Sequence, residues 1–250
     1  MRWQSAFFTG IAAFAWCFSD PFSFVEQRGL LALSIGVMTL TAYLPVRLSP
    51  WFHAPGLALL AFAFSQTPFP DGSSGRLALL TVAACGLLYL SYYPGPLNPL
   101  PRSHTLSRIV VLKNVTVALA WTLATLFVVS QEPPIHWVLH RFLFVFGLSL
   151  FADLRDTTRD QELGIITLAS ILGYNKTKWL AALVVFASGI MLLSPDLPSR
   201  PALLWSSTAS FVCGTILLTL KQNIPERHVG PLIDGLMAIT ATGTMLATLV

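Results

Sequence analysis

The sequence predicts an all-α, polytopic membrane protein that forms a single domain over residues 1–250. Hydrophobic residues make up 54% of the chain, charged residues only 10%, and the mean hydropathy is +0.69. Soluble domains carry about 25% charged residues. The apolar residues fall into nine runs that match the roughly 20-residue helix needed to cross a bilayer. We therefore expect nine transmembrane helices, contact with membrane lipids, and no nucleic-acid partner.

Each helix is delimited by breaks that contain proline, glycine or charge. The longest connection is 94–108, where four prolines favour an extended chain over a helix. The sixth helix starts at Pro133 and Pro134 and leads to Asp153. The other eight helices are expected over residues 6–18, 29–48, 52–69, 76–93, 109–129, 179–193, 203–220 and 232–250.

The basic residues predict the orientation in the membrane. When alternate loops are assigned to opposite sides, eleven of the fifteen lysines and arginines fall on one side, and lysine and arginine favour the cytoplasmic side. The sequence therefore predicts an inner or cytoplasmic membrane protein with its amino terminus in the cytoplasm and its carboxyl terminus outside. The eleven residues are Arg2, Arg47, Arg102, Arg108, Lys113, Arg155, Arg159, Lys176, Lys178, Lys221 and Arg227.

Three aspartates directly follow the sixth apolar run. Asp153, Asp156 and Asp160 share one face of a helix, where carboxylates repel unless a cation lies between them. This spacing indicates a divalent metal such as Mg²⁺, which often takes one or two carboxylates together with water and phosphate. The alternative is that Arg155 and Arg159, interleaved with the acids, form a self-paired and solvated helix end. The residues alone leave both interpretations open.

The wider string Asp153-Leu154-Arg155-Asp156, with Asp160, Gly164, Thr167-Leu168 and Leu172-Gly173, resembles the second aspartate-rich motif of the UbiA superfamily of intramembrane prenyltransferases. Residues 112–123 are similar to the family's fifth helix, and the stretch around Asp234 is similar to its last. The resemblance implies nine helices in a ring around a lipid-accessible cavity, and Mg²⁺ bound to the diphosphate of a prenyl donor. It implies a catalytic role for Asp153, Asp156 and Asp160, with Asp156 and Asp160 as metal ligands. The diphosphate-binding residues implied are Lys113, Asn114, Arg155, Tyr43 and Arg47.

The family's first aspartate-rich motif is degenerate here. Tyr43 and Arg47 match it, but Val46 and Pro50 stand where the family has acids or asparagine. Two hypotheses for function follow. The first is Mg²⁺-dependent transfer of a prenyl group from a prenyl diphosphate to an aromatic or lipid acceptor. The second is a non-catalytic scaffold or quinone- or isoprenoid-binding subunit, with other membrane-protein subunits as partners.

Other polar residues leave alternatives open. Lys113 either holds a phosphate or extends to lipid headgroups, and Asp234 either faces a wet cavity or pairs locally. His136 and His140 are four residues apart, but with Arg141 they lie at the opposite end of the sixth helix from the acids. We interpret these three residues as ordinary interfacial residues.

Overall fold

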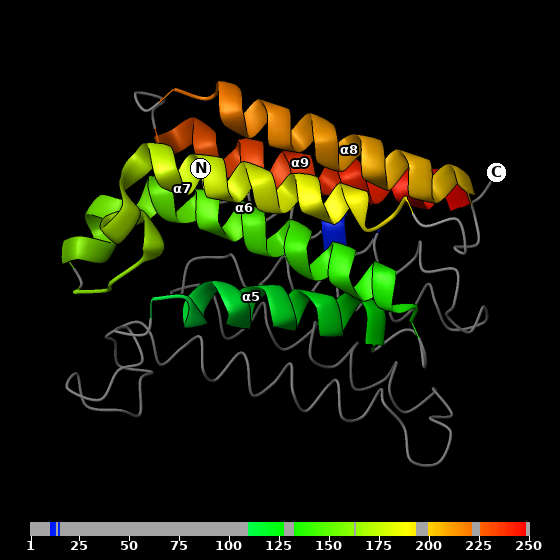
Figure 1. Cartoon of the computed structure of the whole chain (residues 1–250), viewed down its shortest axis with the longest axis horizontal. Coiled ribbons are helices and arrows are strands. Elements are labelled where there is room, and N and C mark those ends of the chain that lie inside the picture. The colour runs from blue at the N-terminus through cyan, green and yellow to red at the C-terminus, as the bar shows by residue number, and fades with distance from the viewer. Residues whose placement is uncertain are drawn as a thin grey trace, which may run out of the picture.

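The computed structural model describes residues 11–13, 15, 110–127, 133–162, 164–193, 200–221 and 226–248. In this part of the chain every regular element is a helix (Figure 1). The elements are α5 (Leu112–Thr122), continued by the π-helical turn η5 (Leu123–Phe127), then α6 (Ile135–Glu162), α7 (Leu168–Ile190), α8 (Arg200–Thr219) and α9 (Glu226–Thr248). The expected all-α class is confirmed for these residues.

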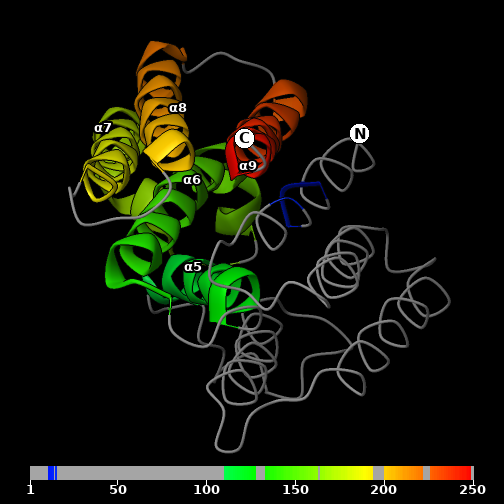
Figure 2. The same cartoon turned by 90° about the vertical axis from the view of Figure 1, so that its right-hand side faces the viewer.

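The helix α6 is the centre of the described bundle. It packs against α5 on one side, and against α7 and α9 on another, while α8 closes the group by packing on α7 and α9 (Figures 1 and 2). Phe144 and Leu148 of α6, Val185 of α7 and Leu217 of α8 are buried between these helices. Because α6 touches α5 as well as α7 and α9, it connects α5 to the group formed by α7, α8 and α9.

Three of the described helices are long and apolar enough to cross a membrane. These spans are Ile135–Thr158, Pro201–Thr219 and His228–Ala247. Large apolar side chains such as Leu183, Leu204 and Ile239 are exposed on the outside of the bundle, where a lipid environment would cover them. The described part is therefore an all-helical membrane protein. The count of nine spans, the ring around a cavity and the 94–108 loop involve residues outside the described ranges and stay predictions.

Two helices, the seventh and the ninth, start well before the residues expected from the sequence. The seventh helix begins at Leu168 rather than at 179, because Thr167 and Ser170 form a reciprocal capping box there. At Gly173, with φ 76°, the backbone leaves helical geometry, so α7 consists of a short and a long helical part on the two sides of a kink. The ninth helix begins at Glu226 rather than at 232, with Pro231 inside it. Pro231 has no backbone N–H and cannot donate a helical hydrogen bond, and packing of the apolar face of α9 offsets this loss.

Close helix packing predicts opposite effects for two glycine substitutions. A Cβ added to Gly147 of α6 would lie 2.6 Å from Val185 Cγ2 and 2.9 Å from the Ala181 carbonyl oxygen, whereas one added to Gly235 of α9 would meet no atom within 4 Å. Overpacking lowers stability by about 1–3 kcal/mol, and alanine gains about 1 kcal/mol over glycine in a helix. We expect Gly147→Ala to lower the unfolding temperature in detergent and Gly235→Ala to leave it unchanged or raise it. Equal shifts would contradict the close approach of α6 and α7.

Candidate functional site

The carboxyl-terminal end of α6 carries the three aspartates as one continuous helix. No glycine or proline interrupts residues 148–162, so the helix continues beyond the apolar span, which ends at Thr158. Asp153 and Asp160 are buried, with 2% and 1% of their surface exposed, whereas Asp156 is partly exposed. Two of the three acids therefore lie inside the protein rather than in water.

Lys113 of α5 lies between the two buried acids. Its Nζ donates to Asp153 Oδ1 at 2.8 Å and to Asp160 Oδ2 at 3.0 Å. The lysine is itself buried, at 8% exposure. A side chain that extended to lipid headgroups would be exposed, so that interpretation of Lys113 is wrong. The cation expected between the carboxylates is supplied by the protein itself.

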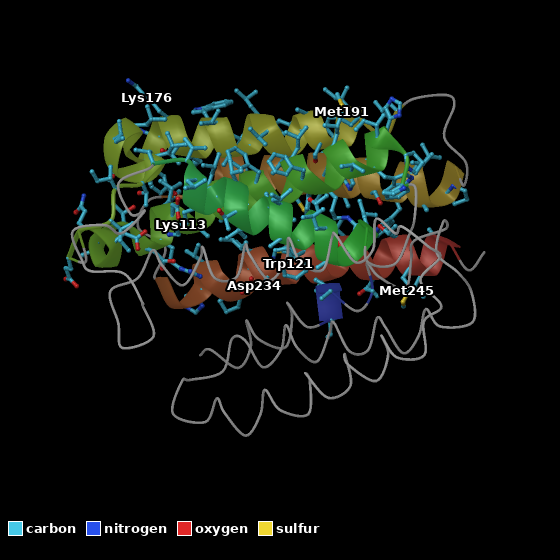
Figure 3. The ribbon with its side chains drawn as sticks, turned by 90° about the horizontal axis from the view of Figure 1, so that it is seen from below. Lys113, Trp121, Lys176, Met191, Asp234 and Met245 are labelled. Carbon is cyan, nitrogen blue, oxygen red and sulfur yellow. The ribbon has the colours of Figure 1, made fainter. Side chains whose placement is uncertain are left out.

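Asn114 completes the contact between α5 and α6. Its Nδ2 donates to Asp153 Oδ2 at 3.0 Å and to Ser149 Oγ at 3.2 Å, and Ser149 Oγ donates to the Phe146 carbonyl oxygen at 2.8 Å. We call the group formed by Lys113, Asn114, Ser149, Asp153 and Asp160 the carboxylate cluster. Figure 3 labels Lys113 on α5 and shows it toward the same end of the bundle as Lys176.

Two oxygens of the carboxylate cluster have no hydrogen-bond partner among the residues that the structure describes. They are the buried Asn114 Oδ1 and Asp160 Oδ1. With one lysine and two carboxylates, the cluster carries an excess negative charge when both acids are ionised. Burial raises the pKa of Asp160 above its ordinary value, although the nearby Lys113 lowers it. Buried acceptors without partners are unusual and indicate room for a further donor or a cation.

Asp156 belongs to a separate pair. Arg155 Nε donates to Asp156 Oδ1 at 2.8 Å, and Arg155 Nη2 donates to Oδ2 at 2.5 Å. Both side chains are more than a quarter exposed, which limits the stabilisation from such a pair to about 0–1 kcal/mol. The self-paired interpretation of the acidic segment is thus correct for Arg155 and Asp156, while the side chain of Arg159 lies outside the described part of the protein. Asp153 and Asp160 take their cation from another helix.

The oxygen atoms of the acidic segment could supply only some of the ligands that a hard cation such as Mg²⁺ requires. In the described residues, no three His, Cys, Asp or Glu side chains are placed to share a metal ion, and Asp234, buried on α9, joins no such group. Asp156 and Asp160 are four residues apart on one helix face, and Asp160 Oδ1 is an oxygen without a partner. Two carboxylates with water and phosphate are enough for Mg²⁺. These residues therefore fit Mg²⁺ provided that a phosphate-bearing ligand shares it.

The opposite end of α6 corrects a prediction. His140 and Arg141 are each 1% exposed, so they are not interfacial residues. His140 Nδ1 lies 3.1 Å from the Ser188 carbonyl oxygen, and Arg141 Nη1 donates to Thr125 Oγ1 at 2.8 Å. Thr125 lies in the π-helical turn η5. These contacts hold α5 and α7 to α6, which is a structural role.

Sequence reasoning missed Ser149 and the direct contact of Asn114 with Asp153. Ser149 lies one turn before Asp153 on α6, and a serine inside an apolar run gives no distinct signal by itself. Tyr43, Arg47, Val46 and Pro50 lie outside the described residues, so a cavity mouth with Asp156 and Asp160 on one wall and the apolar Val46 and Pro50 on the opposite wall stays a prediction.

The whole chain is similar in fold to a solved UbiA homolog from Archaeoglobus fulgidus bound to GPP and Mg²⁺. The match covers 99% of this chain and 96% of that chain, with a TM-score of 0.62 and 13% sequence identity. No protein-family profile and no curated protein matches the sequence. At this identity the likeness concerns the fold, which is UbiA-like.

Proposed function

We propose that this chain, with its UbiA-like fold, is an intramembrane prenyltransferase that binds a prenyl diphosphate at the carboxylate cluster. The observation that carries the proposal is the meeting of Lys113 and Asn114 of α5 with Asp153 and Asp160 of α6 at one end of the bundle. Sequence reasoning assigned these four residues to a single site. The structurally similar homolog binds GPP and Mg²⁺, which supports the same class of ligand here.

The residues of the site have distinct roles in this proposal. Asp156 and Asp160 hold Mg²⁺, and the chemistry supplied by bound Mg²⁺ is neutralisation of the diphosphate, which makes it a better leaving group. Asp153 keeps Lys113 oriented through its Oδ1. Lys113 and Arg155 then donate to diphosphate oxygens, and the Asn114 side chain positions the α5 end of the site. Tyr43 and Arg47 are proposed to face the same diphosphate from the second helix.

The transfer itself breaks the bond between the allylic carbon and the diphosphate oxygen. An aromatic or lipid acceptor then forms the new bond to that carbon and loses a proton. The positive charge that develops on the prenyl group is long-lived only where water is excluded. The burial of Asp153 and Asp160 at the end of apolar helices supports such a dry site.

The membrane orientation belongs to the proposal too. We propose that the carboxylate cluster and the 94–108 loop face the cytoplasm, that the amino terminus lies on the same side and that the carboxyl terminus lies outside. The cytoplasm is where a soluble prenyl diphosphate headgroup is accessible.

Turnover by the purified protein tests the proposal. In nanodiscs, with labelled GPP or a longer prenyl diphosphate and an aromatic acceptor such as 4-hydroxybenzoate, we expect diphosphate release that requires Mg²⁺ and stops with EDTA. Release measured with native membrane lipids in place of the aromatic acceptor would indicate a lipid acceptor. Absence of release with every donor and acceptor would contradict prenyl transfer.

A second function, isoprenoid binding without catalysis, is favoured by one specific observation. Lys113 already lies where a cation would bridge Asp153 and Asp160, so the site is stable without a metal. In that case labelled GPP would bind saturably and independently of Mg²⁺, with no release of diphosphate. Constant co-purification with other membrane subunits would support the same function.

A further inference from the structure

A second polar site lies at the same end of the bundle, on a different face of α6. A cavity of about 450 Å³ opens there among the ends of α6, α7, α8 and α9. On α6 the centre of its lining is the stripe of Leu154 and Thr158, on a different side of the helix from Asp153 and Asp160, and Thr157 forms the edge next to these acids. The other lining residues of α6 are Phe151, Arg155 and Gln161. No residue of α5 and none of the carboxylate cluster lines it, but Arg155, proposed above to contact the diphosphate, does. The cavity therefore adjoins the proposed transferase site without including the carboxylate cluster.

The kink in α7 shapes the wall of the cavity. Gly173, with φ 76°, separates the short first part of α7 from the long second part, and a Cβ built on it would meet no atom within 4 Å. Residues with a side chain rarely adopt this φ. The kink brings Ser170 and Tyr174, from the two sides of the break, to the lining of one cavity.

The charge of the lining is positive. None of the residues that line the cavity in the described part is an acid, whereas Lys221 and Arg155 both line it. Arg155 is paired with Asp156, and Lys221 adds a second positive charge to the lining. A third basic residue, Lys178, does not line the cavity but contacts a residue that does. Its side chain donates to the carbonyl oxygens of Leu218 and Leu220 at 3.2 Å each. Carbonyl groups solvate this charge without neutralising it.

The cavity also lies at the level where the apolar spans end. Its lining includes Thr158, the last residue of one span, Leu220, the residue after a second span, and Val229, the second residue of a third. Apolar side chains such as Leu154 and Val229 adjoin hydroxyl groups such as those of Thr158 and Ser170. A cavity that combines apolar and polar residues at this level fits a ligand in which a charged group is attached to an apolar chain.

We propose that this cavity binds a phosphate group, either in the headgroup of an anionic phospholipid or as free phosphate. Lys221 attracts the anion, and the Thr158 hydroxyl donates a hydrogen bond to one of its oxygens. The hydroxyl groups of Ser170 and Tyr174 already donate to the carbonyl oxygens of Thr167 and Leu220 and form the polar wall of the cavity. The apolar part of the lining favours the lipid source, because free phosphate gains nothing from Leu154 or Val229. This proposal does not rest on the transferase function, although Arg155 adjoins both sites, and binding here needs no Mg²⁺.

The test uses the full chain in detergent with two matched lipids. Phosphatidylglycerol and phosphatidylcholine with identical acyl chains are titrated and bound lipid is counted by native mass spectrometry. Labelled inorganic phosphate is measured separately by equilibrium dialysis. We expect tight binding of phosphatidylglycerol, reduced about fivefold by Lys221→Gln, in line with the attraction of a single lysine to an anionic lipid. Thr158→Trp, which fills the mouth and keeps every charge, should abolish the binding.

Lys176→Gln is the matched control. Lys176 lies on α7 near the same end of the bundle, is exposed and does not line the cavity (Figure 3). Selective loss of phosphatidylglycerol in Lys221→Gln and Thr158→Trp establishes a lipid headgroup site. Selective loss of inorganic phosphate in the same variants establishes free phosphate as the ligand. Equal effects of Lys176→Gln and Lys221→Gln, or equal binding of the two lipids without phosphate binding, would overturn the proposal.

Discussion

Lys113→Met is expected to destabilise the protein by about 3–5 kcal/mol, the range measured when one partner of a buried ion pair is removed. Methionine has nearly the length of lysine, so the change removes the charge and leaves the packing largely intact. Asp153 and Asp160, whose side chains are 3% and 1% exposed, would then face each other without this cation. Unfolding in detergent, followed by helical circular dichroism against temperature or sodium dodecyl sulfate, measures the loss.

Two further variants separate charge from packing at Lys113. Lys176→Met makes the same replacement at an exposed position of α7, and we expect a change below about 0.5 kcal/mol. The double variant Lys113→Met with Asp160→Asn removes one of the two stranded acids and should recover part of the lost stability. Wild-type stability in Lys113→Met would show that the lysine does not bridge the acids in the membrane.

Asp160→Asn and Asp156→Asn are expected to lower kcat/KM for prenyl transfer by about a hundredfold or more, the loss typical when one electrostatic contact to the transition state is removed. Both changes keep the size of the side chain and remove a charge that the proposed mechanism uses to hold Mg²⁺. Asp160→Asn should nevertheless fold, because Lys113 keeps Asp153 as its partner and the cluster changes from excess negative charge to neutrality.

Glu162→Gln is the matched control for the acid variants. Glu162 is an exposed acid at the end of the same helix, and it has no place in the proposed mechanism. We expect its turnover to equal that of the wild type. Diphosphate release that is unchanged in both Asp156→Asn and Asp160→Asn would contradict the assignment of these carboxylates. If the wild type itself binds GPP without turnover, the binding function replaces the transferase.

Several features of the site were predictable because they depend on residues that are close in sequence. Asp153, Asp156 and Asp160 lie three or four positions apart, so a helix through them places them on one face wherever the helix packs. Arg155 is adjacent to Asp156, which makes their pairing a local event. The prolines at 133 and 134 mark the start of α6 for the same reason, since their effect on the backbone is local.

Local sequence signals gave wrong predictions where contacts between helices had the larger effect on the structure. Pro231 is an ordinary helix breaker, yet α9 continues through it. Gly173 does break helical geometry, but a helical segment already begins before it at Leu168. The buried face of each helix, with Val185 on α7 and Ile233 on α9, stabilises the helix beyond its local propensity. His140 and Arg141 were expected at the interface because polar residues near a helix end usually lie there. They are buried instead, because Ser188 and Thr125 from neighbouring helices accommodate their polar groups.

The sequence by itself determined the all-helical membrane class, the helix that carries the acids and the face on which they lie. Composition and periodicity are sufficient for these features, because bilayer thickness and helix geometry are the same for every chain. Only the tertiary structure decided which basic side chain pairs with Asp153 and Asp160. Lys113 and Asp153 are separated by 40 positions, and their contact depends on how α5 and α6 pack. The same packing separates Asp156 from the carboxylate cluster and places Lys221 beside a cavity on another face of α6, and neither arrangement follows from spacing along one helix.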